Sequence, residues 1–522
     1  MNWLLLCRML GMLMMLVGAS MVFSMPWAFP FCGQTEVFES RGFQGMVSAF
    51  ACSLLSGGAL YAIGRNERGT ILRKEALAVV GLGWCLAGVL GALPYLFAAV
   101  ESAPGVRANF ADALFESLSG FTTTGASVLT NVEDADMVPR CVLFWRSFTH
   151  WLGGMGIIVL FVAVLGQLGA GGKAMMRREV PGPIAEAVRP RVRETALMMW
   201  AIYVGFSVME TALLMLEGLS FYDALCHTFG TMATGGFSTF NTSVAHFRQP
   251  AVEITMVVFM VLAAANFGLY DAVMRAPGGG ARRPWKRFAP LVRDREFRLY
   301  LTILFIACCL VTASLLRHHV YDDFATALRH ASFGVVSLMT TTGFGTEDFT
   351  QWTQFSKAIL LVLMFIGGCA GSTGGGIKVV RFLLFFKILW LELERAFRPN
   401  VVRPLRIGGT AIDDGVRREV TIYFGLVLMV FAASWLLLVG IESDQHWDVP
   451  GKHSTAEKLF DCASAVAATL NNVGPGMGIV GPTSNYAFFS SGSKLLLTLL
   501  MVLGRLELFA ILVLLFPTFW KN

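Results

Sequence analysis

The stretch DFATALRHASFGVVSLMTTTGFGT, residues 323–346, joins a moderately apolar segment, too short to cross a bilayer, to a terminal glycine motif. Three more stretches have the same design: ADALFESLSGFTTTGAS at 111–127, FYDALCHTFGTMATGGFST at 221–239 and KLFDCASAVAATLNNVGPGMG at 458–478. Each lies between two long apolar runs. The order of apolar run, half-helix, glycine turn and apolar run therefore occurs four times, which predicts four related units.

The composition around these stretches is that of a membrane protein. Of the 522 residues 55% are hydrophobic and only 15% are charged, and the mean hydropathy is +0.63, whereas a soluble domain has about 25% charged residues. The apolar runs predict ten transmembrane helices, at about 5–28, 44–64, 76–98, 141–168, 195–217, 251–275, 299–317, 356–391, 419–441 and 493–517. The fold class expected is an all-α membrane protein with ten transmembrane helices and four re-entrant pore helices.

The basic residues indicate the orientation of the chain. Of its 41 Lys and Arg residues, 27 lie in four short loops, at 65–74, 173–193, 275–298 and 378–418, and only 9 lie in the loops between them. By the positive-inside rule the four basic loops and both termini are cytoplasmic. The net charge of +6 is explained by this topology, so it does not indicate a nucleic-acid partner.

The first apolar run could be confused with a signal peptide. It has little positive charge before it and no A-x-A cleavage site, so we interpret residues 5–28 as a retained first span. The ten cysteines contain no C-x-x-C motif, and therefore predict neither a zinc site nor a disulfide framework.

The glycine turns predict a pathway for a cation. Irregular backbone at membrane depth is tolerated only when it is buried in protein or lines a water-filled cavity, so four such turns imply one shared cavity. The C-terminal end of each half-helix would direct a partial negative charge at that cavity. Glycine reaches positive φ without steric cost, and such backbone can present carbonyl oxygens that replace the hydration shell of an ion. The key glycines are Gly125, Gly235, Gly343 and Gly474, separated by 110, 108 and 131 residues.

Each glycine ends a triplet similar to the T-V-G that begins the filter of potassium channels. One such triplet is weak support, because a glycine after a helix is usually only a C-cap. Four in matching positions predict one filter that binds K⁺ as the transported ion. The predicted K⁺-binding residues are Thr123, Thr124, Gly125, Ala233, Thr234, Gly235, Thr341, Thr342, Gly343, Asn472, Val473 and Gly474.

Three further motifs complete a family resemblance: FWRSFTHWLGGMGI at 144–157, FIGGCAGSTGGGIKVVR at 365–381 and LGRLELFAILVLL at 503–515. With the four filter triplets, they make residues 70–520 resemble the TrkH, KtrB and HKT superfamily of potassium transporters, and its TrkH-type members most closely. The resemblance implies four fused helix–pore-helix–helix units around one pore. The units would be 71–172, 173–280, 281–400 and 401–522, after two extra N-terminal helices in 1–70.

The resemblance also implies the setting of the protein. It would lie in the cell (inner) membrane as a homodimer and would bind a cytosolic RCK-type nucleotide-binding regulatory subunit, for which the loops at 275–298 and 387–418 are candidate contact surfaces. Glycine in all four filter positions implies a preference for potassium over sodium. No organic cofactor is expected in this chain.

The segment GGCAGSTGGG, residues 367–376, should interrupt the eighth apolar run because glycine-rich sequence destabilises a helix. The resemblance gives it the role of a gating loop beneath the filter, formed by Gly371, Ser372, Thr373, Gly374, Gly375, Gly376 and Lys378. A packing site of small residues between helices is the alternative. A nucleotide P-loop is excluded, because Ile377 separates Gly376 from Lys378 and no strand precedes them.

Two arginines within apolar runs need partners. Arg505 lies in the middle of the last run, where a charge is costly unless it faces the interior or a cavity. The resemblance makes it an electrostatic barrier in the pore, near Glu507 or the carbonyls of the gating loop, and a purely structural ion pair is the alternative. Arg146 is predicted to be a structural support that either snorkels to the membrane interface or pairs with Asp112 or Glu116.

Other classes of function fit less well. A membrane enzyme is disfavoured, because the apolar runs contain no paired catalytic carboxylates and no metal-ligand cluster. A carrier with inverted repeats would also use broken helices, but here four repeats share one orientation. The sequence therefore predicts potassium uptake through a gated pore, and leaves a symporter coupled to Na⁺ or H⁺ as the alternative.

Overall fold

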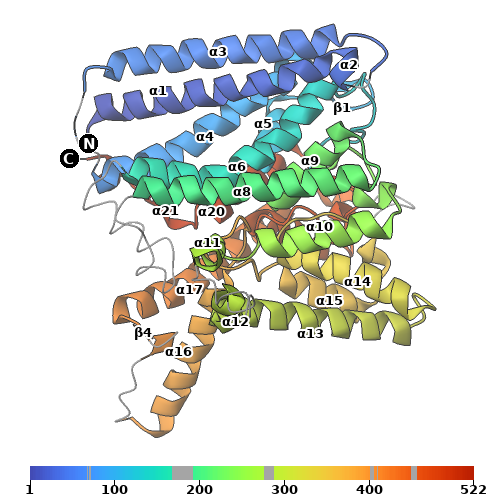
Figure 1. Cartoon of the computed structure of the whole chain (residues 1–522). Coiled ribbons are helices and arrows are strands. Elements are labelled where there is room, and N and C mark those ends of the chain that lie inside the picture. The colour runs from blue at the N-terminus through green and yellow to red at the C-terminus, as the bar shows by residue number, and fades with distance from the viewer. Residues whose placement is uncertain are drawn as a thin grey trace.

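A computed structural model describes residues 1–33, 35–67, 69, 72–166, 192–275, 287–399, 405–407, 410–447 and 455–521. In these ranges the chain is mostly helical, and long helices run side by side through the molecule (Figure 1). The strands form two short antiparallel hairpins, β1 (Glu101–Ala103) with β2 (Val106–Arg107) and β3 (Arg406–Ile407) with β4 (Thr410–Ala411). The predicted all-α class is confirmed.

The N-terminal helices lie at one edge of the molecule (Figure 1). Helix α1 (Trp3–Ser20) continues as η1 (Met21–Ala28), and α2 (Pro30–Gly33) leads to α3 (Ser40–Gly64). Small residues let α1 and α3 approach closely: a Cβ on Gly11 would lie 2.5 Å from the backbone nitrogen of Tyr61. This pair lies in the residues predicted to precede the repeated units.

The remaining elements follow in chain order and are grouped here by the four predicted units. The first contains α4 (Arg73–Phe97), α5 (Phe110–Phe121) and α6 (Arg140–Gly166), and the second α8 (Val192–Leu216), α9 (Phe221–Met232), η3 (Ser243–His246), α10 (Pro250–Ala263) and α11 (Phe267–Arg275). The third contains α12 (Ala289–Arg293), α13 (Arg295–Arg317), α14 (Phe324–Met339), η5 (Phe349–Gln351), α15 (Gln354–Leu363) and α16 (Val379–Phe397). The fourth contains α17 (Asp414–Ile441), α18 (Asp444–Trp447), α19 (Lys458–Leu470), η6 (Gly478–Val480), α20 (Ser491–Arg505), α21 (Phe509–Leu512), η7 (Val513–Leu515) and α22 (Pro517–Trp520).

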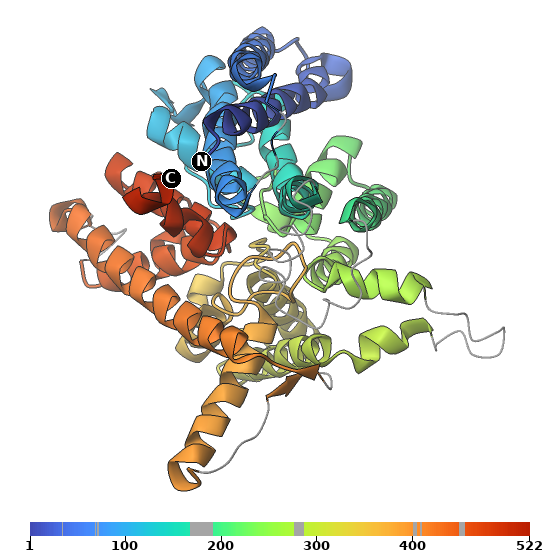
Figure 2. The same cartoon turned by 90° about the vertical axis from the view of Figure 1, so that its left-hand side faces the viewer.

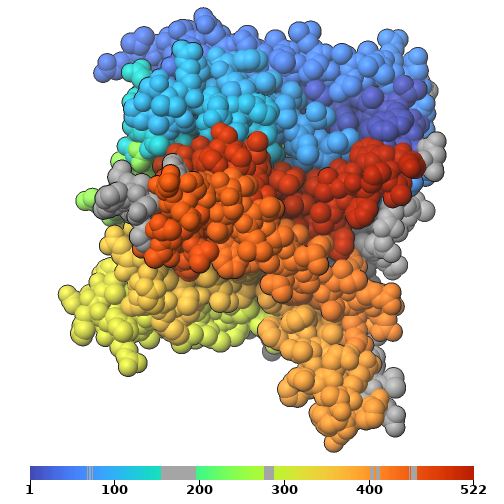
Figure 3. Space-filling view, turned by 180° about the vertical axis from the view of Figure 1, so that it is seen from behind, coloured from blue at the N-terminus to red at the C-terminus, as the bar shows by residue number. Residues whose placement is uncertain are grey.

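The helices surround a common centre. In Figure 2 the colours pass around this centre from blue through green and yellow to red, and loop segments between α15 and α16 lie in the middle. Helix α16 projects from the body of the molecule (Figures 1 and 3).

Two predicted spans are broken where the sequence suggested continuous helices. The span predicted at 251–275 bends by 87° between α10 and α11, and the one at 493–517 bends by 114° after Arg505. At the first bend the side chain of Asn266 accepts from the N–H of Gly268 (2.8 Å), which favours a new helix start. At the second bend Glu507 and Leu508 have φ of 55° and 62°, which ends the helix.

The number of spans therefore stays a prediction. Within the described ranges, six helices are long and apolar enough to cross a membrane, or up to eight if each bent pair counts as one span. The eighth predicted span is divided into α15 and α16, as the glycine-rich segment led us to expect. The proposed unit boundaries near 70, 172, 280 and 400 lie outside the described residues, as do most of the basic loop at 173–193 and residues 276–286 of the basic loop at 275–298.

The two ends of the chain lie together at one end of the helix bundle (Figure 1). The ring of Trp3 stacks on that of Trp520 at 5.6 Å, and the ammonium of Lys74 donates to the carbonyl of Lys521 (3.2 Å). The number of crossings and the side of the membrane on which the ends lie stay predictions.

Candidate functional site

The four predicted half-helices are present as α5, α9, α14 and α19. Three of them begin with a side-chain cap: Asn109, Ser220 and Asp323 accept hydrogen bonds from the N–H groups of Asp112, Asp223 and Thr326. The C-terminal halves of all four are buried. Each helix therefore starts at the surface and ends inside the protein.

All four half-helices end in the same turn. The second residue after the end of each helix has positive φ: Thr123 (53°), Thr234 (55°), Thr341 (60°) and Asn472 (54°). The residue after it donates its backbone N–H to the carbonyl of the residue five positions earlier. These hydrogen bonds run from Thr124 to Ser119 (2.9 Å), from Gly235 to Gly230 (2.7 Å), from Thr342 to Ser337 (2.9 Å) and from Val473 to Ala468 (2.8 Å). This is the Schellman arrangement. Positive φ is rare for a β-branched residue, so three threonines here carry the kind of backbone strain that is found at functional sites.

The turns meet in a closed ring. Gly125, Gly236, Gly343 and Gly474 also have positive φ, at 79°, 79°, 83° and 93°. A Cβ added to any of these glycines would clash with a carbonyl oxygen of the next turn. The clashes are between Gly125 and the carbonyl of Gly235, Gly236 and that of Thr342, Gly343 and that of Val473, and Gly474 and that of Thr124. The contacts run from the first turn to the fourth and back to the first. Only glycine permits this close approach of four backbones around one axis.

The predicted triplet of the second turn is one residue too early. Ala233 is the capping residue of α9, in the place of Thr122, Thr340 and Asn471. The residues that correspond to Thr123, Thr124 and Gly125 are Thr234, Gly235 and Gly236. Because two glycines are adjacent here, the sequence motif alone did not determine which of them belongs to the ring. The other three predicted triplets occupy equivalent positions.

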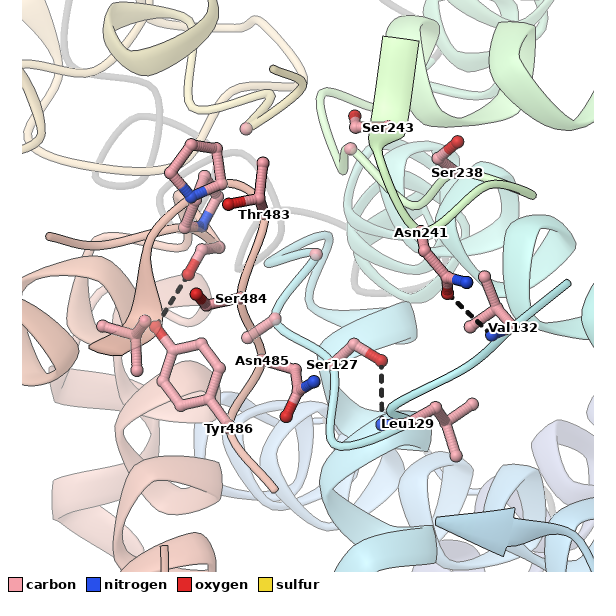
Figure 4. A pocket seen from close by; sticks show the side chains of 18 of the residues that line it. Ser127, Leu129, Val132, Ser238, Asn241, Ser243, Thr483, Ser484, Asn485 and Tyr486 are labelled. Atoms are coloured by element: carbon pink, nitrogen blue, oxygen red, sulfur yellow. Dashed lines mark hydrogen bonds between the residues drawn. The ribbon is translucent and has the colours of Figure 1, made fainter. Parts of the chain in front are cut away.

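A cavity of about 110 Å³ opens onto the ring from the side of the loops predicted to be outside. It is lined by the four ring glycines and by polar residues that follow them, among them Ser127, Ser238 and Asn241 (Figure 4). The hydroxyl of Tyr486 donates to the carbonyl of Gly474 (2.7 Å), and its N–H donates to the carbonyl of Ser127 (2.7 Å). Tyr486 thus joins the fourth turn to the segment after the first.

The loop between α15 and α16 lies against the other end of the ring. The N–H of Gly375 donates to the hydroxyl of Thr341 (2.7 Å), and a Cβ on Gly375 would lie 2.7 Å from the carbonyl of Asn471. The N–H of Cys369 bonds to the carbonyl of Ala264 (2.8 Å), at the bend between α10 and α11. The predicted gating-loop residues are therefore in contact with the third and fourth turns and with the second unit.

The loop is also held by two cations. The ammonium of Lys378 bonds to the carbonyl of Gly374. Arg505, buried at the end of α20, donates to the carbonyl of Thr373 (2.7 Å) and to that of Gly153 (3.3 Å). Of the two partners suggested for Arg505, the loop carbonyl is correct. Glu507 instead pairs with Arg381 of α16 (2.6 Å).

The predicted alternatives for Arg146 are also resolved. Its guanidinium pairs with Glu116 of α5 (2.5 Å), whereas Asp112 pairs with Lys494 of α20 (2.6 Å). Both pairs are buried. Nothing in the local sequence distinguishes the two carboxylates, because the choice depends on which helix faces which.

Groups that could hold a transition metal are missing from the described ranges, which contain no cluster of three or more His, Cys, Asp or Glu side chains suited to one. The ring offers backbone carbonyls and hydroxyls, and such oxygen ligands suit a hard cation.

Known proteins resemble this chain over most of its length. The TrkH family of cation transport proteins matches residues 43–521. The Trk system potassium uptake protein TrkH of Salmonella typhimurium is 37% identical over 487 residues, which cover 93% of this chain and 94% of that protein. The Trk system potassium uptake protein TrkG of Escherichia coli (strain K12) is 32% identical over 470 residues, 90% of each chain.

A solved structure agrees with the sequence matches. The crystal structure of the potassium transporter TrkH from Vibrio parahaemolyticus matches with a TM-score of 0.83 and 34% identity, and the match covers 100% of both chains. By sequence and by fold, the chain belongs to the TrkH family of cation transport proteins, which are transporters and not enzymes.

Proposed function

We propose that this protein takes up potassium across the cytoplasmic membrane through a selective, gated pore in which the ring of four turns is the filter. The observation that carries the proposal is the closed set of contacts from each ring glycine to the next turn. The names of the relatives as potassium uptake proteins support K⁺ as the transported ion.

The filter would work by replacing water with backbone oxygen. Each turn brings a carbonyl next to the ring, from Thr124, Gly235, Thr342 and Val473. Four half-helices end at these turns, and the partial negative charge of their C-termini favours a cation there. The hydroxyl of Thr123 and the side-chain oxygen of Asn472, at the start of two turns, have no hydrogen-bond partner within the described part of the chain, which suits groups that contact water or an ion.

In this proposal the filter residues are Thr123–Gly125, Thr234–Gly236, Thr341–Gly343 and Asn472–Gly474, with Gly236 in place of Ala233. The loop from Gly371 to Gly376 occludes the pore on the cytoplasmic side of the filter. Its bonds to Thr341 and Arg505 hold it there. The positive charge of Arg505 beside the loop raises the energy of a cation in the same region.

The finer points of topology and assembly belong to the same proposal. We infer ten transmembrane helices and four pore helices in the four units given above, both termini in the cytoplasm, and a location in the inner membrane. A homodimer and a cytosolic RCK-type regulatory subunit complete the proposed assembly. The position of the two chain ends at one end of the bundle supports the topology.

Uptake measurements test the proposal directly. Wild type should restore potassium uptake to a cell that lacks its own uptake systems, and Gly343→Ser and Gly125→Ser should impair the uptake or its selectivity. Gly425→Ser is the matched control, because no atom lies within 4 Å of a Cβ at Gly425. Unchanged uptake and selectivity in both filter variants would overturn the filter assignment.

A further inference from the structure

Helix α6 presents two buried polar side chains, Arg146 and His150, to the region between the first and second turns of the ring. They are four residues apart, so they lie on the same face of the helix. Neither belongs to the filter residues or to the gating loop. Their contacts nevertheless extend to both turns.

Arg146 first contacts the unit of the first turn. Its Nε donates to Oε1 of Glu116 (2.5 Å), and both groups are almost fully buried. The carboxylate of Glu116 also accepts from the hydroxyl of Ser127 (3.0 Å) and from the N–H of Val128 (3.0 Å). Glu116 therefore connects pore helix α5 and helix α6 to the segment that follows Gly125.

The same guanidinium also contacts the second turn. Its Nη1 donates to the carbonyl of Ser238 (3.0 Å), and its central carbon lies 3.5 Å from the centre of the Phe237 ring. Ser238 is two residues beyond Gly236. One planar cation thus joins the segments that follow two neighbouring ring glycines, by a fork of donors and by stacking.

His150 makes a second connection one helical turn away. Its Nε2 accepts from the N–H of Phe237 (3.2 Å), so the ring proton is on Nδ1, which donates to the carbonyl of Gly120 (2.8 Å). Gly120 belongs to α5. The neutral imidazole thereby connects the first pore helix to the second turn, and it stacks on Phe237 with ring centres 4.1 Å apart.

The imidazole also lies directly behind the ring. A Cβ on Gly235 would be 2.5 Å from Cγ of His150. The carbonyl of Gly235 is the group that faces Gly125 across the first contact of the ring. The position of His150 therefore limits how far this carbonyl can move away from the axis.

We propose that Arg146 and His150 are positioning residues that fix the spacing between the first and second turns, and that this spacing sets the discrimination between potassium and sodium. The inference rests on the proposed function of the ring as a filter. Selectivity by coordinating carbonyls depends on the size of the site or on the number and mobility of its oxygens, and a rigid support behind the backbone affects each of these.

Arg146→Lys and Glu116→Gln test the inference in purified protein reconstituted in bilayers. Lysine keeps the charge but loses the fork of donors and the stacking. We expect the potassium-to-sodium permeability ratio, measured from the reversal potential with K⁺ on one side and Na⁺ on the other, to fall by about tenfold in each variant. The permeability ratio of the double variant should be no lower than that of the more affected single variant, because Arg146 and Glu116 act as one unit.

Arg329→Lys is the matched control. Arg329 of α14 forms a similar pair with Glu253 of α10 (2.5 Å), but none of its described hydrogen bonds goes to a residue of the ring. Its permeability ratio should equal that of wild type. If Arg146→Lys does not fold, Glu116→Gln carries the test, because glutamine keeps the size and shape of the glutamate.

The outcomes separate the two proposals. A wild type without potassium-selective conduction would overturn the function proposed for the ring. A selective wild type with unchanged ratios in Arg146→Lys and Glu116→Gln would overturn only the positioning role. An equal loss of the permeability ratio in Arg329→Lys would also overturn it, because an Arg–Glu pair without bonds to the ring would then have the same effect.

Discussion

The backbone N–H of Gly375 donates to the hydroxyl of Thr341 across 2.7 Å, so the loop between α15 and α16 is bonded directly to the ring of turns. Thr341 has positive φ and begins the third turn. Because the hydroxyl accepts from the loop, a displacement of the loop changes the surroundings of a filter residue. Closure of the loop and the state of the filter are therefore expected to be coupled.

Thr341→Val should favour the open loop. Valine keeps the shape of threonine but cannot accept the hydrogen bond from Gly375, and the loss of one such bond should increase the open fraction by about threefold or more. Efflux from potassium-loaded liposomes measures this change. Thr340→Val is the control, since that hydroxyl bonds to the carbonyl of Val336 (2.8 Å) in α14 and to the hydroxyl of Thr342 (2.8 Å). Equal efflux in Thr341→Val and wild type would contradict the coupling.

Shortening the loop within residues 368–376 should raise conductance. The loop lies below the ring and is held by Ala264 and Arg505, so a shorter connection between α15 and α16 could not reach both contacts. Single-channel recording of the purified variant measures the effect. A fall in conductance in a variant that still purifies as a folded protein would show that the loop supports the pore and does not occlude it.

Arg505→Ala should increase potassium flux more than Arg505→Lys does. Both variants lose the fork of donors to Thr373 and Gly153, but only alanine removes the charge. The difference between them isolates the electrostatic barrier, which we expect to amount to several-fold in flux. Equal flux in the two variants would indicate that Arg505 acts only as a structural support.

Glu210→Gln distinguishes a channel from a proton-coupled symporter. Glu210 of α8 is fully buried, and neither carboxylate oxygen has a hydrogen-bond partner within the described residues, which makes it the natural candidate for a coupling proton site. A pore needs no such site. We therefore expect potassium flux in wild type and in Glu210→Gln to reverse at the potassium equilibrium potential, whatever Na⁺ or H⁺ gradient is imposed. The symporter would be favoured if the reversal potential of wild type shifts with the proton gradient and that of Glu210→Gln does not.

The sequence predicted the parts of the site that depend on local features. The length of an apolar run limits what can cross a membrane, and a glycine motif after a short helix specifies a turn, so α14 and the turn through Gly343 were found directly. The glycine-rich segment from Gly371 to Gly376 was found in the same way, because a helix cannot continue through it.

The parts that were missed depend on contacts between distant segments. The bend after Ala263 accompanies hydrogen bonds to the loop more than 100 residues away, such as that between the hydroxyl of Thr373 and the carbonyl of Ala263. The positive φ of Thr123 is the opposite of what a β-branched residue prefers, so the residue type does not predict it. The register at Gly235 and Gly236 was ambiguous because either glycine can take positive φ.

The central claim is that four turns act together as one filter, and the measurement that tests it most directly is the reversal potential with K⁺ and Na⁺ on opposite sides of a bilayer. It should be recorded for wild type and for Gly125→Ser, Gly236→Ser, Gly343→Ser and Gly474→Ser, one substitution at a time. The account predicts a potassium-selective wild type and a lower potassium-to-sodium ratio in every one of the four variants, because each substitution pushes on the next carbonyl of the ring. The account would be contradicted if any one of the four variants conducts and has the same potassium-to-sodium ratio as wild type.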